Sequence, residues 1–382
     1  MPQPPPNLFK RFGFSTLAIA EQVVRPGRRP SFEQLKTVRN FIFLQFERPL
    51  GTVVHATPVF RALREALPDA YIAVAAAARA GEILRMDPCI DRCETVPELS
   101  NFLAATSAVR SLVHSMPPGP VCLMTTIGNR SPRIGMLALA AGPCWRAGFT
   151  MAPRLYDLPL TFRPPRAQIA GNLDLLRSFD YPVESREPRI CYTASDERAA
   201  ADMLSAIPRE GIVHRIAFIT HNSGDQANRW PLDRFRQVID NLSARVPMQA
   251  VFVGSASEVD AVQQLYENCR AQRVNLAGKT SVPVLAAVFA QCDLVIGLDT
   301  GPFHVARAVG LPGVVVAPAW QDPAEWLPIG NPRYRILRGP SIASPPEGYC
   351  MAEISVAQVV SAALELLANT PNLRGDSVNA PA

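Results

Sequence analysis

An acidic residue, a hydroxyl, a glycine and a histidine follow a short apolar run in the C-terminal half of the chain. The run 294–296 predicts a buried strand, and Asp299, Thr300, Gly301 and His304 come soon after it. A helix beginning near Gly301 would offer free backbone N–H groups and the positive end of its dipole, which together favour a phosphate group. Thr300 or Asp299 can cap such a helix, and Gly301 lets a ligand approach the backbone closely.

These four residues are therefore candidates for a ligand site. We expect Thr300, Gly301 and His304 to bind phosphate. A phosphate would repel Asp299, so we expect that carboxylate to contact sugar hydroxyls or to act in positioning. The alternative is an ordinary capped helix in which His304 is packed.

A second polar segment follows the predicted strand 216–219. Its small and polar residues could hold another face of a diphosphate, and Arg229 could supply the counter-charge. The segment ends at Pro231, a favoured first helical position. A surface loop that caps its own helix is the alternative. The candidate residues are Ser223, Gly224, Asn228 and Arg229.

A third polar segment ends the first predicted strand, 41–46. Glu47 or His55 could act there as a general base toward an acceptor. A helix residue packed at the domain face is the alternative for His55.

Strands and helices alternate twice along the chain, which predicts two α/β domains with parallel sheets. The first set has strands 41–46, 71–75 and 121–124. After a proline-rich stretch at 151–195, taken as a linker or interdomain helix, the pattern restarts. Its strands are 216–219, 250–253, 274–276, 294–296 and 313–317, the last closing the sheet, and its helices are 231–245, 256–270, 282–291 and one after Gly301.

Two doubly wound, Rossmann-like domains facing a cleft are the expected architecture, with ligands outside the carboxyl ends of the strands. The expected divisions are a basic leader 1–39, an acceptor-side domain 40–185, a nucleotide-sugar-binding domain 186–352 and a C-terminal helix and tail 353–382.

Composition narrows the class of protein. No stretch resembles a membrane span or a signal peptide, and eight scattered cysteines suit buried thiols in a reducing compartment, so a cytoplasmic protein without a metal site is expected. Residues 1–40 hold seven Lys or Arg against two Glu, which leaves the rest nearly neutral although the net charge is +5. This distribution argues against nucleic-acid binding. The basic leader would either contact anionic lipid or be a disordered tail.

The three polar segments, taken in order, resemble glycosyltransferase family 9, the heptosyltransferase-like family. Its best-known members add heptose from ADP-heptose to the lipopolysaccharide core. The resemblance covers residues 40–368. Beside Asp299–His304 it rests on Arg61–Arg64 before Pro68–Ala70, Asn129–Ser131, Arg146–Phe149, Arg229–Pro231, Val253–Ser255 and Leu276–Thr280.

The resemblance implies the two-domain glycosyltransferase B fold, no metal or other cofactor, and inversion at the anomeric carbon. It implies a nucleotide-sugar donor and a lipid-linked glycan acceptor at the inner face of the cytoplasmic membrane, which gives the leader a use. Asp299 would lie near the sugar, and donor phosphate would meet Thr300, Gly301, Ser223 and Gly224. The nucleoside would rest on Gly254, Ser255 and Thr280.

Two positions depart from the family pattern. Thr52 replaces an aspartate that resembles the acceptor-activating base, and Asn228 replaces a lysine just before the Trp-Pro pair. A threonine hydroxyl does not accept a proton usefully near neutral pH. Glu47 could take this role, or the acceptor could need no strong base. A family member that binds a nucleotide-sugar without transferring it is the main alternative. A nucleotide-sugar epimerase is disfavoured because no carboxylate pair stands beside the sugar site.

Overall fold

The computed structural model describes residues 30–46, 49–184, 186–205, 211–221 and 228–373 of the chain. Glu47, Ser223, Gly224 and most of the basic leader lie outside these residues, so their predicted roles stay predictions. Within the described part, none of the helices combines the length and apolar character needed to cross a membrane.

Six parallel strands form the sheet of the first domain, in the order β3-β2-β1-β4-β5-β6. Neighbouring strands pair in parallel throughout, as βαβ connections require. The strands are β1 (Asn40–Gln45), β2 (Tyr71–Ala76), β3 (Arg92–Thr95), β4 (Val121–Thr125), β5 (Trp145–Phe149) and β6 (Leu158–Leu160). The helices are α2 (Phe32–Lys36), α3 (Leu50–Val54), α4 (Thr57–Ala66), α5 (Ala78–Leu84), α6 (Phe102–His114), η1 (Ile127–Asn129), α7 (Pro132–Ala140), η2 (Pro153–Leu155) and α8 (Gln168–Arg177).

The second sheet repeats the same plan, in the order β12-β11-β10-β7-β8-β9. Its strands are also parallel throughout. They are β7 (His214–Ile219), β8 (Met248–Val253), β9 (Gln272–Asn275), β10 (Leu294–Leu298), β11 (Gly313–Val316) and β12 (Tyr334–Leu337). The helices are α9 (Ala194–Leu204), α10 (Leu232–Ser243), η3 (Ala256–Glu258), α11 (Val259–Asn268), α12 (Val282–Ala290), α13 (Gly301–Ala308), α14 (Pro323–Trp326) and α15 (Val356–Leu373).

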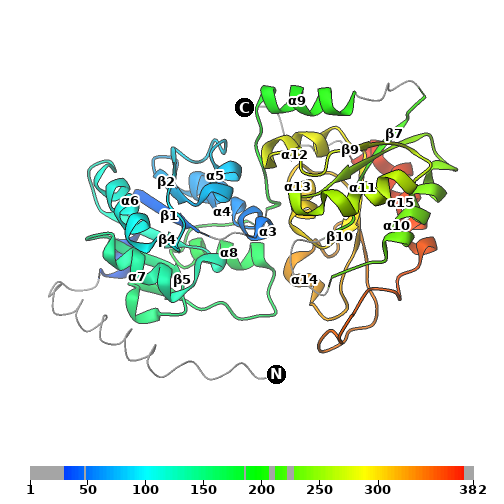
Figure 1. The fold of residues 1–382 in the computed structure, drawn as a ribbon. Coiled ribbons are helices and arrows are strands. Elements are labelled where there is room, and N and C mark those ends of the chain that lie inside the picture. Colours follow the sequence, from blue (N-terminus) through cyan, green and yellow to red (C-terminus); the bar gives the residue numbers. More distant parts are fainter. Residues whose placement is uncertain (1–29, 47–48, 185, 206–210, 222–227, 374–382) are drawn as a thin grey trace.

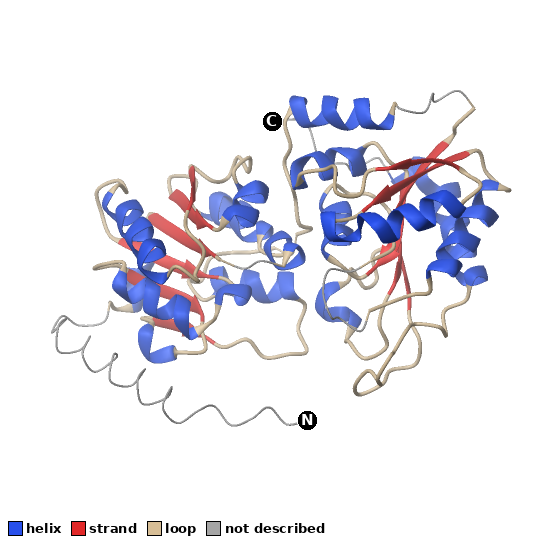
Figure 2. Ribbon diagram, viewed as in Figure 1, coloured by secondary structure: helices blue, strands red, loops and turns tan. Residues whose placement is uncertain are grey.

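Helices cover both faces of each sheet, as Figure 2 shows. The central strand β1 explains why, because all six of its residues are buried. Alternate side chains of β1 enter different apolar clusters, with Phe41 and Phe43 on one face and Ile42 and Leu44 on the other. The two-sided burial predicted from the unbroken apolar run is therefore observed.

In both sheets the strand order reverses between the first and fourth strands in chain order, β1 and β4 in one domain and β7 and β10 in the other. Such a switch point is where doubly wound sheets bind ligands. The segments after β1, β7 and β10 are the three that carry the residues predicted to bind the donor phosphate and to act on the acceptor. The topology therefore brings these segments to the two switch points.

The two domains lie side by side, and α3 and α8 of the first face α13 and α14 of the second (Figure 1). The fold differs from the sequence prediction in several places, among them the strands β3 and β5 of the first sheet, which were not predicted. The strand at 313–317 does not close the second sheet, because β12 pairs beyond it. The stretch 151–195 holds β6, α8 and the start of α9 rather than a single linker helix. Pro231 is the N-cap of α10, which begins one residue later than predicted.

The last part of the predicted leader belongs to the folded first domain. Ser31 caps α2 with a complete capping box, and Leu35 and Val38 are buried in the main apolar cluster. The leader boundary at residue 39 is thus too late, since the apolar spacing of Leu35 and Val38 places them in a core.

Candidate functional site

The corner between β10 and α13 is formed by the segment that carries the strongest chemistry in the sequence. Thr300 is the N-cap of α13 in an extended conformation, but its side chain makes no capping hydrogen bond. Its hydroxyl instead lies 3.5 Å from the Leu298 carbonyl oxygen. A helix whose N-cap hydroxyl leaves the first-turn N–H groups alone keeps those groups for another acceptor.

Asn228 ties the loop after β7 to this corner. Its side-chain Nδ2 donates to the Asp299 carbonyl oxygen at 2.6 Å, and the Asn228 side chain is buried. The neighbouring Arg229 is exposed. The C-terminal segment holds this loop from behind, since Met351 N donates to the Arg229 carbonyl at 2.8 Å. The structure therefore joins the loop of Asn228 and Arg229 to the corner that carries Asp299.

Asp299 is held from the other side by a chain of two histidines. The Asp299 Oδ1 lies 3.4 Å from His304 Nε2, and the side chains are only 6% and 4% exposed. The other ring nitrogen of His304, Nδ1, lies 3.2 Å from Nε2 of His55, which belongs to the first domain. His55 is the C-cap of α3 and is 1% exposed. A carboxylate and two imidazoles thus form one buried row across the domain boundary.

Two glycines let α3 and α13 approach each other closely enough for this row to form. A Cβ on Gly51 would lie 2.6 Å from His304 Cδ2, and a Cβ on Gly301 would lie 2.7 Å from Leu50 Cβ. Each helix thus has a glycine where a side chain of the other helix packs. We call this contact of α3 with α13, together with Trp326 of α14, the domain interface. The side of Gly301 where a Cβ would stand thus packs against Leu50.

Trp326 packs over both imidazoles, with ring centroids 5.2 Å from His55 and 6.0 Å from His304. Burial at this interface lowers the pKa of His55 well below its usual value, and the nearby His304 and Arg307 lower it further. His55 is therefore neutral at neutral pH. The burial of its side chain fits the packed alternative for His55, and its role as a general base stays a prediction.

The first-domain residues close to the interface are positioned by Asn129. Its Nδ2 donates to Gln45 Oε1 at 3.0 Å, and its Oδ1 accepts from Phe46 N at 2.7 Å. Asn129 thus fixes the end of β1 immediately before Glu47, which lies outside the described residues. Thr52 lies in the first turn of α3 and is half-buried, while its backbone N donates to Pro49 O at 3.2 Å.

The three residues predicted to meet a nucleoside lie on two loops that contact each other. Gly254 and Ser255 follow β8, and Ser255 begins η3 with its own capping box to Glu258. The Gly278 N–H donates to the Gly254 carbonyl at 2.9 Å, which joins this corner to the loop carrying Thr280. The structure therefore brings Gly254, Ser255 and Thr280 into one region of the second domain.

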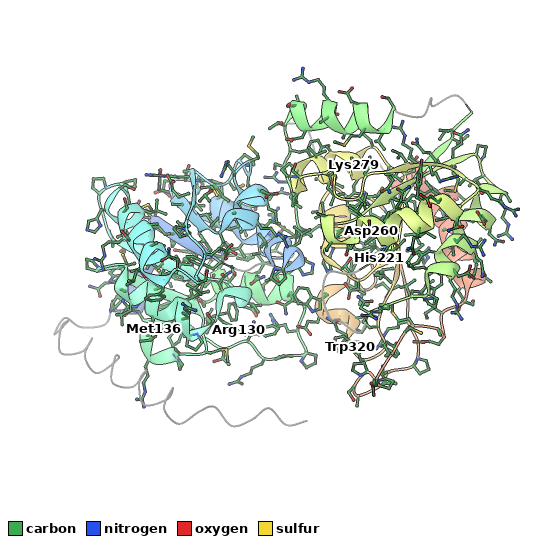
Figure 3. The ribbon with its side chains drawn as sticks, in the orientation of Figure 1. Arg130, Met136, His221, Asp260, Lys279 and Trp320 are labelled. Atoms are coloured by element: carbon green, nitrogen blue, oxygen red, sulfur yellow. The ribbon has the colours of Figure 1, made fainter. Side chains whose placement is uncertain are left out.

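Side chains around these elements are drawn in Figure 3, where Arg130 lies on the first domain and His221, Lys279 and Trp320 lie on the second. His221 follows β7, and its Nδ1 lies 2.7 Å from the Thr220 hydroxyl. Burial lowers the pKa of His221 below its usual value.

A cavity of about 350 Å³ lies between the domains beside His55. His55, Trp326, Arg307 and Glu325 contribute to its lining. Gln168 Nε2 of the first domain donates to Glu325 Oε1 at 2.7 Å beside this cavity. Among the residues that the structure describes, no group of three or more His, Cys, Asp or Glu side chains is arranged to hold a metal ion.

The row His55–His304–Asp299 is the part of the site that sequence reasoning missed. His55 and His304 were each considered alone, and the packed alternative was given for both. Their meeting depends on two glycines and on contact between domains, and no local pattern in the sequence signals it.

Comparison with known proteins identifies the family to which the chain is similar. The model of glycosyltransferase family 9 (heptosyltransferase) matches residues 136–342, more than half of the chain. The chain is 23% identical over 298 residues to lipopolysaccharide heptosyltransferase 3 of Escherichia coli, covering 74% of this chain and 84% of that protein. Two shorter matches, to a lipopolysaccharide core heptosyltransferase of Haemophilus influenzae and a heptosyltransferase 3 of Escherichia coli K12, span only 38% and 29% of those relatives.

Two solved structures share the fold. A glycosyl transferase family 9 protein from Veillonella parvula superposes with a TM-score of 0.76 at 21% identity, covering 87% of this chain and 99% of the other. The Escherichia coli ADP-heptose lipopolysaccharide heptosyltransferase II gives a TM-score of 0.70 at 20% identity, with the same coverage. The two six-stranded parallel sheets therefore form the glycosyltransferase B fold.

Proposed function

Because the chain belongs to glycosyltransferase family 9, we propose that it transfers a sugar from a nucleotide-sugar to a lipid-linked glycan. The observation that carries this proposal is how Asp299 is held at the switch point of the second domain. Asn228 binds its carbonyl oxygen and His304 contacts its carboxylate, directly before the N-terminus of α13. A fixed carboxylate beside a helix N-terminus suits a ligand with both hydroxyl groups and phosphates.

The donor is ADP-heptose in this proposal. A structural neighbour carries ADP-heptose in its name, and the relative that is matched over 84% of its length is named a heptosyltransferase. The diphosphate would meet Thr300, Gly301 and Arg229, together with Ser223 and Gly224, which lie outside the described residues. The nucleoside would rest where Gly254 and Ser255 meet the loop of Thr280.

The transfer itself requires one bond to form and one to break. The acceptor hydroxyl oxygen attacks the anomeric carbon from the side opposite the diphosphate, which inverts that carbon, and the bond to the phosphate oxygen breaks. The α13 N-terminus and Arg229 stabilise the charge on the departing diphosphate without a metal ion. Asp299 orients the sugar through its hydroxyl groups. The acceptor proton goes to Glu47, because the Thr52 hydroxyl is too weak a base.

The acceptor in this proposal is a lipid-linked glycan at the inner face of the cytoplasmic membrane. The basic residues of the leader would contact anionic lipid there. The names of the relatives, which refer to lipopolysaccharide, support this class of acceptor.

The test is a transfer assay with purified protein, a panel of nucleotide-sugars including ADP-heptose, and glycolipid extracts. We expect release of nucleoside diphosphate that depends on both substrates. Asp299→Asn keeps the shape of the side chain but removes its charge, so kcat should fall about 100-fold or more. Folded protein that releases no nucleotide with any donor contradicts the proposal.

A second candidate is a nucleotide-sugar-binding protein that no longer transfers. It is favoured by Thr52, which stands where an aspartate is expected, and by the packing of Leu50 against Gly301 at the α13 N-terminus. Under this alternative ADP raises the melting temperature but no transfer occurs. Activity that appears only in Thr52→Asp would identify the missing carboxylate as the reason.

A further inference from the structure

The buried row of His55, His304 and Asp299 links the two domains chemically as well as sterically. We propose that His55 is a positioning residue, which fixes the tautomer of His304 across the domain interface and thereby the orientation of Asp299. The inference rests on the proposed function, because it concerns how the sugar-orienting carboxylate is set. His55 contacts no substrate in this scheme and acts only through His304.

The hydrogen-bonding capacities of the two rings suit one arrangement in particular. Nε2 of His304 lies 3.4 Å from the Asp299 carboxylate, which can only accept, so a proton on this nitrogen suits the contact, but the contact is too long to hold that tautomer by itself. In the tautomer with that proton, Nδ1 of His304 is bare and accepts. The donor at 3.2 Å is then Nε2 of His55. Neutral His55 consequently has a bare Nδ1.

The surroundings of His55 agree with this arrangement. Its Nδ1 is buried and has no hydrogen-bond partner among the described residues. The opposite tautomer would leave a buried N–H donor unpaired, which is rarer in proteins than an unpaired acceptor. The lining of the cavity beside His55 includes Arg307 and Trp326 together with two carboxylates, Glu187 and Glu325.

The first domain holds His55 firmly enough to impose this geometry. Asn172 of α8 donates from Nδ2 to the His55 carbonyl at 3.1 Å, and its Oδ1 accepts from Ile127 N at 2.9 Å. Trp326 packs against the ring from the second domain. His55 is thus fixed by one domain and in contact with the other, so His304 receives its donor only when the domains meet.

It follows that domain contact and the state of Asp299 are coupled. When the domains are apart, His304 has no donor for Nδ1 and can adopt either tautomer, one of which presents a bare nitrogen to the carboxylate. When they meet, His55 selects the tautomer that donates to Asp299. The site is therefore set where the acceptor and donor domains meet.

The first experiment reads the tautomer directly and does not depend on activity. The chain has five histidines, so their ring ¹⁵N signals can be assigned by single substitutions. In the full-length protein we expect His304 to be protonated on Nε2 and bare on Nδ1, and His55 to be protonated on Nε2. In His55→Phe we expect the His304 signals to shift toward a mixture of tautomers. Identical His304 signals in both proteins would overturn the inference.

The second experiment measures transfer by three variants. His55→Phe keeps a ring but removes the donor, so kcat should fall about 10-fold or more while KM for the donor changes little. His55→Gln restores a donating amide and should recover most of kcat. Val54→Ala, on the same helix and fully buried, is the packing control and should lower stability with little effect on kcat. Equal kcat values in His55→Phe and the wild type would overturn the inference.

The two experiments separate the two proposals. A wild-type protein that shows no transfer but has the expected ring signals refutes the proposed function and leaves the role of His55 in setting His304 supported. Active protein whose His304 signals ignore His55→Phe refutes the inference and leaves the transferase intact.

Discussion

Replacement of Gly51 by alanine should reveal how tightly the domain interface is packed. The new Cβ would lie 2.6 Å from His304 Cδ2. Nonbonded carbon atoms contact at about 3.5–4.0 Å, so the imidazole or α3 must move by about 1 Å. The ring cannot simply rotate away, because His55 and Asp299 contact its two nitrogens. The clash must therefore strain the interface.

The expected loss of stability follows from two opposing effects. A glycine-to-alanine change within a helix stabilises by about 0.5–1 kcal/mol, whereas overpacking a filled contact costs about 1–3 kcal/mol. Gly81→Ala in α5 is the matched control, because its Cβ would meet nothing closer than Thr95 Oγ1 at 3.5 Å. The control variant should therefore show only the stabilisation that alanine gives within a helix, without the cost of overpacking. Gly51→Ala should therefore be less stable than Gly81→Ala by about 1–3 kcal/mol.

Urea unfolding of both variants, followed by circular dichroism, measures this difference. Parallel transfer assays should show a lower kcat for Gly51→Ala, since the row that holds Asp299 is displaced, and an unchanged kcat for Gly81→Ala. If Gly51→Ala is as stable as Gly81→Ala, the close contact of α3 with α13 does not exist in solution and the reasoning fails.

Three further outcomes are expected. The pKa of His55 is depressed in the folded protein, so below its usual value of 6.5 the unfolded chain takes up a proton that the folded chain does not. The free energy of unfolding should then fall from pH 7 to pH 5 with a slope of up to about 1.4 kcal/mol per pH unit from this group. His55→Phe should reduce that slope. His221, whose pKa is also lowered, contributes a slope in the same direction to both proteins. A variant whose free energy of unfolding falls as steeply as that of the wild type would contradict the prediction. Asn228→Ala should cost about 1–3 kcal/mol in urea unfolding, because it removes the 2.6 Å donor to the Asp299 carbonyl; a smaller loss would mean that water replaces the amide. Thr52→Asp should raise kcat and make it depend on the ionisation of a carboxylate, and no gain at any pH would show that the base lies elsewhere.

The architecture could be predicted because each central strand is apolar on both faces and each βα unit is local. The local sequence alone was enough to predict β1 and the glycine-containing corner after β10. The edge strand β12 was missed because its residues beyond Tyr334 are only partly buried and Arg335 interrupts its apolar run. Edge strands need less apolar surface, so their pattern is weak.

The candidate site could be predicted only as separate segments. Asp299 and Asn228 were expected near each other because both follow neighbouring strands of one sheet, and the carboxyl ends of parallel strands share an edge. The approach of His55 to His304 could not be predicted in this way. It depends on how two domains dock, which is decided by the whole shape of the contact and by the absence of a Cβ at Gly51 and Gly301.

The histidine pair joins positions that are 249 residues apart in the chain. Contacts of such long sequence separation form late, because each domain must fold before its surface can dock. Refolding should therefore end with a docking step that is distinct from the formation of either sheet. Trp326, packed on both imidazoles, is an intrinsic fluorophore placed to report that step. The interface that positions Asp299 would then also complete folding, because a newly made chain consists of two tethered domains until it forms.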